Sequence, residues 1–228
     1  MASPAFRASS RRSAGRSLDP VGAHGRILLT ALLTGLGLAA AAGFNAWAVL
    51  LLFHGLYRLL PQEFPGVAAA LLGSQTVLGF ALILFLAEFV ITKIPLLDRF
   101  WELAHTLLRP IVGAFLAVAC VPETSLLPRI GIGLAGAIAT LAAHVTKSTT
   151  RLESTAATRG WTHVALSLTE DIVAVVLAAL VFFVPWVTAL LLPTLLVLLV
   201  THFPRVKRAL GVLFFRLQHP RRRRPAGA

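Results

Sequence analysis

The stretch Ile27–Phe53 reads ILLTALLTGLGLAAAAGFNAWAVLLLF and contains no charged residue. A membrane-spanning helix needs about 20 predominantly apolar residues, so this stretch is long enough to cross a lipid bilayer. Its middle carries Gly35, Gly37 and Gly43, and small residues of this kind let helix backbones approach closely in lipid. The stretch therefore predicts a transmembrane helix that packs against other helices.

The composition of the whole chain indicates the same environment. Of its 228 residues, 57% are apolar and 13% are charged, and the mean hydropathy is +0.82. Soluble domains carry about 25% charged residues, and a fold of this size cannot hide so much apolar surface from water. We therefore expect an all-α membrane protein, a polytopic helical bundle, rather than a soluble enzyme.

Further apolar runs extend the predicted bundle. The run at 111–121 would reach only roughly 17 Å as a helix, less than a hydrocarbon core of about 30 Å. It is therefore either part of a short span or a re-entrant segment. The last run, 172–203, is too long for one straight span, and we divide it near Pro185. The six predicted spans are 27–53, 65–88, 110–127, 129–146, 168–184 and 186–203. In a four-span alternative, 110–127 is re-entrant and 172–203 is a single kinked crossing.

Residues 95–110 show a different pattern. Apolar residues recur there at helical spacing on one face, and charged or polar residues lie mostly on the other. The apolar set is Leu97, Phe100, Trp101, Ala104, Leu107 and Leu108. This pattern predicts an amphipathic helix that lies at the membrane interface.

The formal net charge of +12 is concentrated at the two ends of the chain. Basic residues that flank apolar spans are typical of cytoplasmic segments, so we expect both termini in the cytoplasm. The basic ends would contact anionic lipid head groups rather than nucleic acid. The predicted organisation is a basic, disordered tail at 1–26, a transmembrane domain at 27–204 and a basic cytoplasmic tail at 205–228.

The sequence contains no pattern typical of an enzyme. Cys120 is the single cysteine, so the chain can form no internal disulfide and no cysteine-based metal site. No nucleophile motif, zinc-binding helix or phosphate-binding glycine loop occurs. We therefore predict no catalytic residues, no metal and no cofactor.

A few charged residues next to the apolar spans are the candidates for function, because ionisable groups are costly in a membrane. His144, Lys147 and Arg151 share one helical face and could hold an anionic group, although cations at a helix end also favour the helix dipole. Ser167 and Glu170 fit a capping box before an apolar run, which is the alternative to a proton or cation site. The full candidate set is Glu88, Lys93, Asp98, Arg109, His144, Lys147, Arg151, Ser167, Glu170 and Asp171.

The six-span topology brings these groups together at one end of the bundle. One hypothesis is a small transporter or lipid-carrier translocase. Glu88, Glu170 and Asp171 would handle protons or cations. An anionic substrate would bind through four basic candidates, which are Lys93, His144, Lys147 and Arg151. The alternative is a scaffold or regulator that binds partner helices or anionic lipids, and a homo-oligomer is compatible with either role. A weak internal similarity between 35–41 and 131–137, and between 84–88 and 166–170, raises the question of an inverted repeat.

The spacing of the polar motifs resembles one family. The motifs are Glu88-x-x-x-x-Lys93-Ile-Pro-x-x-Asp98, Arg109-Pro110-x-x-Gly113, His144-x-x-Lys147-x-x-x-Arg151 and Ser167-Leu-x-Glu170-Asp171. They resemble those of the bacterial integral-membrane domain-of-unknown-function family four-one-two-six, over roughly 28–205. The resemblance implies a fold, a motif set and a bacterial inner membrane as the location, but no activity. Thr92 stands where members of that family commonly have an aspartate.

Overall fold

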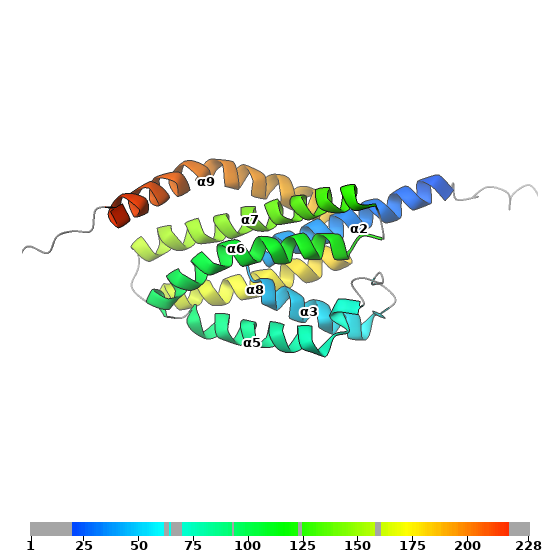
Figure 1. Cartoon of the computed structure of the whole chain (residues 1–228), viewed down its shortest axis with the longest axis horizontal. Coiled ribbons are helices and arrows are strands. Elements are labelled where there is room, and N and C mark those ends of the chain that lie inside the picture. Colours follow the sequence, from blue (N-terminus) through cyan, green and yellow to red (C-terminus); the bar gives the residue numbers. More distant parts are fainter. Residues whose placement is uncertain are drawn as a thin grey trace, which may run out of the picture.

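The computed structural model describes residues 20–61, 64, 70–92, 94–122, 125–157 and 161–218. Within these ranges the main elements are all helices. They are α2 (Pro20–Ala42), α3 (Ala46–Leu59), α5 (Gln75–Ile91), α6 (Pro95–Ala119), α7 (Leu126–Ala157), α8 (Trp161–Phe183) and α9 (Val187–Gln218). Figure 1 shows them packed side by side along one long axis.

Four helices in the described part of the chain are long and apolar enough to cross a membrane. The qualifying segments are Gly25–Ala42, Phe100–Ala119, Leu126–Arg151 and Val164–Phe183. Helix α3, helix α5 and the first half of α9 are apolar but shorter. These helices indicate an integral membrane protein, as the composition predicted. They do not reproduce the six predicted spans.

The predicted single span at 27–53 is wrong, because the chain breaks at Gly43–Asn45. Helix α2 ends at Ala42 and α3 begins at Ala46. The Asn45 side chain accepts hydrogen bonds from the backbone N–H groups of Trp47 and Ala48, at 3.1 and 3.0 Å, so it caps α3. The chain reverses there, and α3 runs back beside α5 and α8 (Figure 1).

The predicted interfacial helix is also wrong. Residues 95–110 and most of the predicted span 110–127 form one continuous helix, α6, with Pro110 in its interior. Its polar face points into the bundle, where Arg109 is 0% exposed, whereas Phe100 and Leu107 are 70% and 76% exposed on the outside. The helix is amphipathic as predicted, but because its surroundings are apolar the polar face turns inward. The re-entrant alternative for 110–127 is wrong too, because most of this segment belongs to the continuous helix α6.

The ends of the last helices correct two further details. Helix α8 begins at Trp161, so Ser167 lies inside the helix and the predicted capping box does not form. The break between α8 and α9 falls at residues 184–186, where the sequence placed it near Pro185. Helix α9 then continues past Pro204 to Gln218, into the segment assigned to the basic tail.

The helices alternate in direction along the bundle. Helix α2 begins at one end and α9 ends at the opposite end (Figure 1). The prediction of both termini on one side requires an even number of crossings. Four of the described helices are long enough to cross a membrane, and the side on which each terminus lies stays a prediction. The similar sequence segments do not form a structural repeat. The first pair lies on α2 and α7, which run in the same direction, and the second pair lies on α5 and α8, which run in opposite directions. In a parallel repeat both pairs of helices would run in the same direction, and in an inverted repeat both pairs would run in opposite directions.

Small residues bring the helices close together. A Cβ atom added to Gly43 would lie 2.5 Å from the Cβ of Ala143 on α7, and one added to Gly35 would lie 2.7 Å from the backbone oxygen of Ala117 on α6. A Cβ on Gly136 would lie 2.6 Å from the oxygen of Gly113. Backbone contacts of this kind are the main way in which helices associate in lipid.

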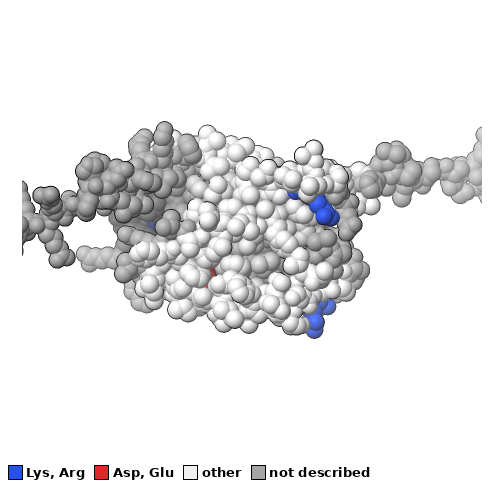
Figure 2. All heavy atoms as spheres, in the orientation of Figure 1, with Lys and Arg blue, Asp and Glu red and all other residues white. Residues whose placement is uncertain are grey.

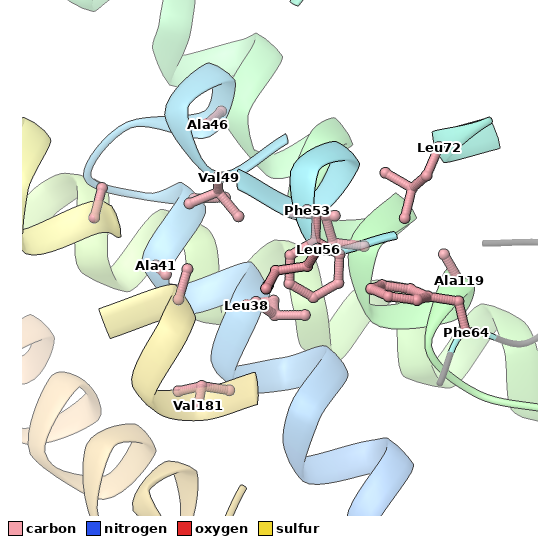
Figure 3. Close-up of a cluster of buried hydrophobic side chains, with 14 residues drawn as sticks. Leu38, Ala41, Ala46, Val49, Phe53, Leu56, Phe64, Leu72, Ala119 and Val181 are labelled. Atoms are coloured by element: carbon pink, nitrogen blue, oxygen red, sulfur yellow. The ribbon is translucent and has the colours of Figure 1, made fainter. Parts of the chain in front are cut away.

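The core and the surface differ from those of a soluble protein. Figure 3 shows Leu38, Phe53, Leu56 and Phe64 converging between the helices. On the face drawn in Figure 2, the described surface carries very few charged side chains, and the larger basic patches lie near the end where α2 begins. Such a surface suits lipid.

Candidate functional site

Six charged side chains meet inside the bundle, and we call them the central ionic network. It comprises Glu88 from α5, Glu102 and Arg109 from α6, Lys147 and Arg151 from α7, and Glu170 from α8. Glu102 is the most accessible of them, with 14% of its side chain exposed, and the others are 7% or less. Three carboxylates thus balance three cations in a site almost closed to solvent.

Two pairs in the network are tight. The Arg109 Nη2 atom donates to Glu88 Oε1 at 2.6 Å. The Arg151 Nε atom donates to Glu170 Oε1 at 2.8 Å, and its Nη2 atom donates to the second oxygen of the same carboxylate. A two-pronged guanidinium–carboxylate pair is among the strongest and most geometrically defined of charge-assisted hydrogen bonds.

Lys147 shares its charge among several acceptors. Its Nζ atom lies 3.2 Å from Glu102 Oε1, 3.3 Å from Glu170 Oε2 and 3.9 Å from Glu88 Oε1. It also donates to the backbone oxygen of Phe44 at 2.8 Å. The ammonium group therefore links α5, α6 and α8 to the break between α2 and α3.

Among the three carboxylates, Glu102 lies near the largest number of cations in the network. Its oxygens lie 3.2 Å from Lys147 Nζ and 3.7 Å from nitrogens of both Arg109 and Arg151. The hydroxyl of Ser148 donates to it at 3.1 Å. The sequence-based candidate set omitted Glu102, because its helix was placed at the membrane interface.

A signal for Glu102 was nevertheless present. Glu102, His105 and Arg109 follow the same i, i+3, i+7 spacing as His144, Lys147 and Arg151. The two triplets face each other across the α6–α7 contact, which is the most extensive one between helices. Matching the two patterns would have predicted an interhelical network.

Hydrogen-bond partners assign both histidines at the network as neutral. The hydroxyl of Thr106 donates to the Glu102 backbone oxygen at 2.8 Å, so it accepts from Nε2–H of His144 at 3.1 Å. Arg109 Nη1 then donates to His144 Nδ1 at 2.6 Å. For His105, Nδ1–H donates to the Trp101 backbone oxygen and Nε2 accepts from the indole N–H of Trp47, both at 3.0 Å.

The break between α2 and α3 completes the site. Arg109 Nη1 donates to the Gly43 backbone oxygen at 3.3 Å, so cations from α6 and α7 satisfy carbonyls at the negative end of α2. On the other side of the break, Asn45 Nδ2 donates to Asp171 Oδ1 at 2.8 Å. The second oxygen of Asp171 is buried and has no hydrogen-bond partner among the described residues.

The order of these polar residues along the chain can be compared with known families. The profile of the family named Domain of unknown function (DUF4126) matches residues 32–205. The chain is a member of the DUF4126 family. No curated protein and no solved structure matches the chain. The match spans the break, the central ionic network and the helices that carry them, so the family resemblance read from the polar motifs is confirmed.

Most of the predicted residues of this DUF4126 protein lie together. Glu88, Arg109, Lys147, Arg151 and Glu170 belong to the network, His144 contacts Arg109, and Asp171 lies at the break. Ser167 shares a hydrogen bond of 3.0 Å with Thr92, whose hydroxyl also donates to the Glu88 backbone oxygen. Thr92 therefore joins α5 to α8 through uncharged hydrogen bonds. Lys93 and the side chain of Asp98 lie outside the described residues.

The paired charges limit what the site can bind. A buried charge without a partner costs several kcal/mol in a protein interior, and here each cation already has a carboxylate within 3.3 Å. An added anion would therefore have to replace a carboxylate, and it can do so at low cost only when that carboxylate is neutralised. Any anion that bound here would therefore require protonation of one of the three carboxylates.

Proposed function

We propose that this DUF4126 protein is a small transporter in which the central ionic network couples the movement of an anionic group to that of a proton. The observation that carries the proposal is a buried, charge-balanced network next to a helix break inside an apolar bundle. Ionisable groups in such positions commonly form ion pathways or proton relays. The anionic group can belong to a small solute or to the head group of a lipid carrier.

The break between α2 and α3 supports a transport role. Transporters commonly build their sites from discontinuous helices whose termini and unwound carbonyls contact ions. Irregular backbone at membrane depth is tolerated only where protein or a cavity surrounds it. Here Asn45 is fully buried, and Arg109 and Lys147 contact the carbonyls at the break.

The shared partners suggest how the network rearranges. When a proton neutralises Glu170, Arg151 and Lys147 lose their nearest charge on α8, and an incoming anion takes its place. Lys147 can meanwhile keep its contact with Glu102, 3.2 Å away. Each step preserves the balance of charge, so none leaves an isolated ion in the apolar interior.

The proposal includes the location of the protein. We place it in a bacterial inner membrane with the end of α9 toward the cytoplasm, because Arg205, Lys207, Arg208 and Arg216 follow the apolar part of that helix. The basic segments would contact anionic lipid head groups rather than nucleic acid. We propose no enzymatic activity and no cofactor.

Reconstituted vesicles with a trapped pH-sensitive dye test the coupling. We expect an inward gradient of phosphate, sulfate or succinate to acidify the vesicle lumen, and to do so faster when the outside is acidified. Glu170→Gln and Lys147→Ala should abolish the acidification, whereas Arg58→Gln, which removes an exposed cation, should not. No acidification by wild-type protein with any of the three anions would overturn the proposal for small solutes. Unchanged acidification in both network variants would remove these residues from the mechanism.

A scaffold is the second candidate, and the complete pairing of the cations favours it. A network with no free charge can serve to fix the positions of α5, α6, α7 and α8. In that case the network variants would lower the thermal stability of the protein, and wild-type vesicles would move no protons under any of the three gradients.

A further inference from the structure

A second site lies near the end of the bundle where α2 begins. It is a cavity of about 760 Å³ between α2, α3 and the ends of α6 and α8. None of its lining residues belongs to the central ionic network. Its volume falls within the range of about 300–1,000 Å³ that is typical of small-molecule sites.

Aromatic rings form one wall of the cavity. The ring centroids of Phe53, Phe64 and Phe182 lie 5.4–5.6 Å from one another. Phe53 and Phe64 also belong to the hydrophobic core drawn in Figure 3, so this wall is continuous with the core. A preformed aromatic wall favours an apolar ligand, because the protein need not reorganise to receive it.

The part of the lining that α2 contributes contains polar residues. Arg26 is the one charged residue in the lining, and its side chain is exposed. Thr30 and Thr34 follow it at i+4 and i+8, on the same face of α2. The lining therefore changes from a cation, through hydroxyl groups, to aromatic rings.

We propose that this cavity binds an amphiphile with an apolar chain and an anionic head. The chain would lie against Phe182, whose ring packs on the buried rings of Phe53 and Phe64, and the head group would pair with Arg26. The ligand can be an anionic membrane phospholipid or a free fatty acid, which share this chemistry. The inference goes beyond the proposed function and does not depend on it, since the cavity contains no network residue.

The single cysteine of the chain offers a direct test, because Cys120 is partly exposed and lines the cavity. Burial raises the pKa of the Cys120 thiol to about 12, and N-ethylmaleimide reacts with the thiolate. We would therefore measure at alkaline pH how fast this neutral reagent modifies Cys120 in the full-length protein in nanodiscs. Phosphatidylcholine alone would be compared with phosphatidylcholine containing phosphatidylglycerol, oleate or the uncharged oleyl alcohol. The reagent is neutral, so the surface charge of the membrane does not bias its local concentration.

The anionic additives should slow the modification about fivefold, the result expected when about four-fifths of the sites are occupied, and oleyl alcohol should not. Arg26→Gln should remove the protection, and Arg58→Gln, which changes another exposed arginine, should keep it. Protection by phosphatidylglycerol alone or by oleate alone supports the site and identifies the source of the ligand. Equal rates in all four membranes, equal protection by oleyl alcohol, or protection that survives Arg26→Gln would overturn the proposal.

Discussion

Charged side chains are stabilised in different ways toward the two ends of the bundle. At one end, six charged side chains are enclosed by apolar helices and neutralise one another. Toward the other end, a cavity with an aromatic wall carries a single exposed cation, Arg26. A charge at the edge of the bundle needs no internal partner because water and head groups solvate it, whereas a charge inside must be paired. Loss of a charge should therefore have very different consequences at the two ends.

The largest effect should come from Arg109→Met. This change leaves Glu88 buried without its closest cation, and breaking a buried pair from one side costs about 3–5 kcal/mol. Thermal unfolding in detergent should show a clear fall in Tm, whereas Arg58→Gln should leave Tm unchanged. The double variant Arg109→Met/Glu88→Leu should recover part of the loss. A double variant as unstable as the sum of the single variants would contradict the pairing.

The next effect should come from the close crossing of α6 and α7, which holds the two triplets of the network face to face. Gly136→Val would force a side chain to within 2.5 Å of the Ala117 Cβ, and overpacking of this kind costs about 1–3 kcal/mol. Gly131→Val on the same helix is the matched control, because an added Cβ there meets nothing within 4 Å. The same fall in Tm for both variants would show that this crossing is not tight.

A smaller effect is expected at the break between α2 and α3. Asn45→Ala removes the cap of α3, which is worth about 1 kcal/mol, together with the hydrogen bond to Asp171. Asn45→Asp should retain the cap but place a second carboxylate against Asp171. In thermal unfolding, the Asp variant should therefore be less stable than wild type at neutral pH and should approach it on acidification. A stability difference that is independent of pH would argue against direct contact of the two side chains.

The smallest effect on stability, and a sharp test of the arrangement, comes from labelling the two ends. Leu59→Cys and Thr155→Cys, each in a Cys120→Ser background, lie near opposite ends of the bundle on α3 and α7 (Figure 1). A membrane-impermeant thiol reagent applied from outside should label one of them and not the other. Labelling of both from the same side would contradict the helix directions described above.

Much of the site was predictable from local sequence. Glu88, Arg109, Lys147, Arg151 and Glu170 stand out because ionisable residues are rare beside long apolar runs. Glu102 was missed, since an amphipathic pattern by itself does not say whether the polar face points toward water or toward other helices. Asn45 was missed because one asparagine in an uncharged stretch carries no periodic signal.

The apolar runs by themselves determined the class of the protein, because a chain this apolar requires lipid as its solvent. The polar motifs likewise determined its family. The number and direction of the helices, the inward turn of the polar face of α6 and the break at Asn45 were decided by the tertiary structure. The physical reason is that charge in an apolar bundle is tolerated only where a partner of opposite sign lies within a few ångströms. Those partners come from helices far apart in the sequence, so only their packing shows which residues meet.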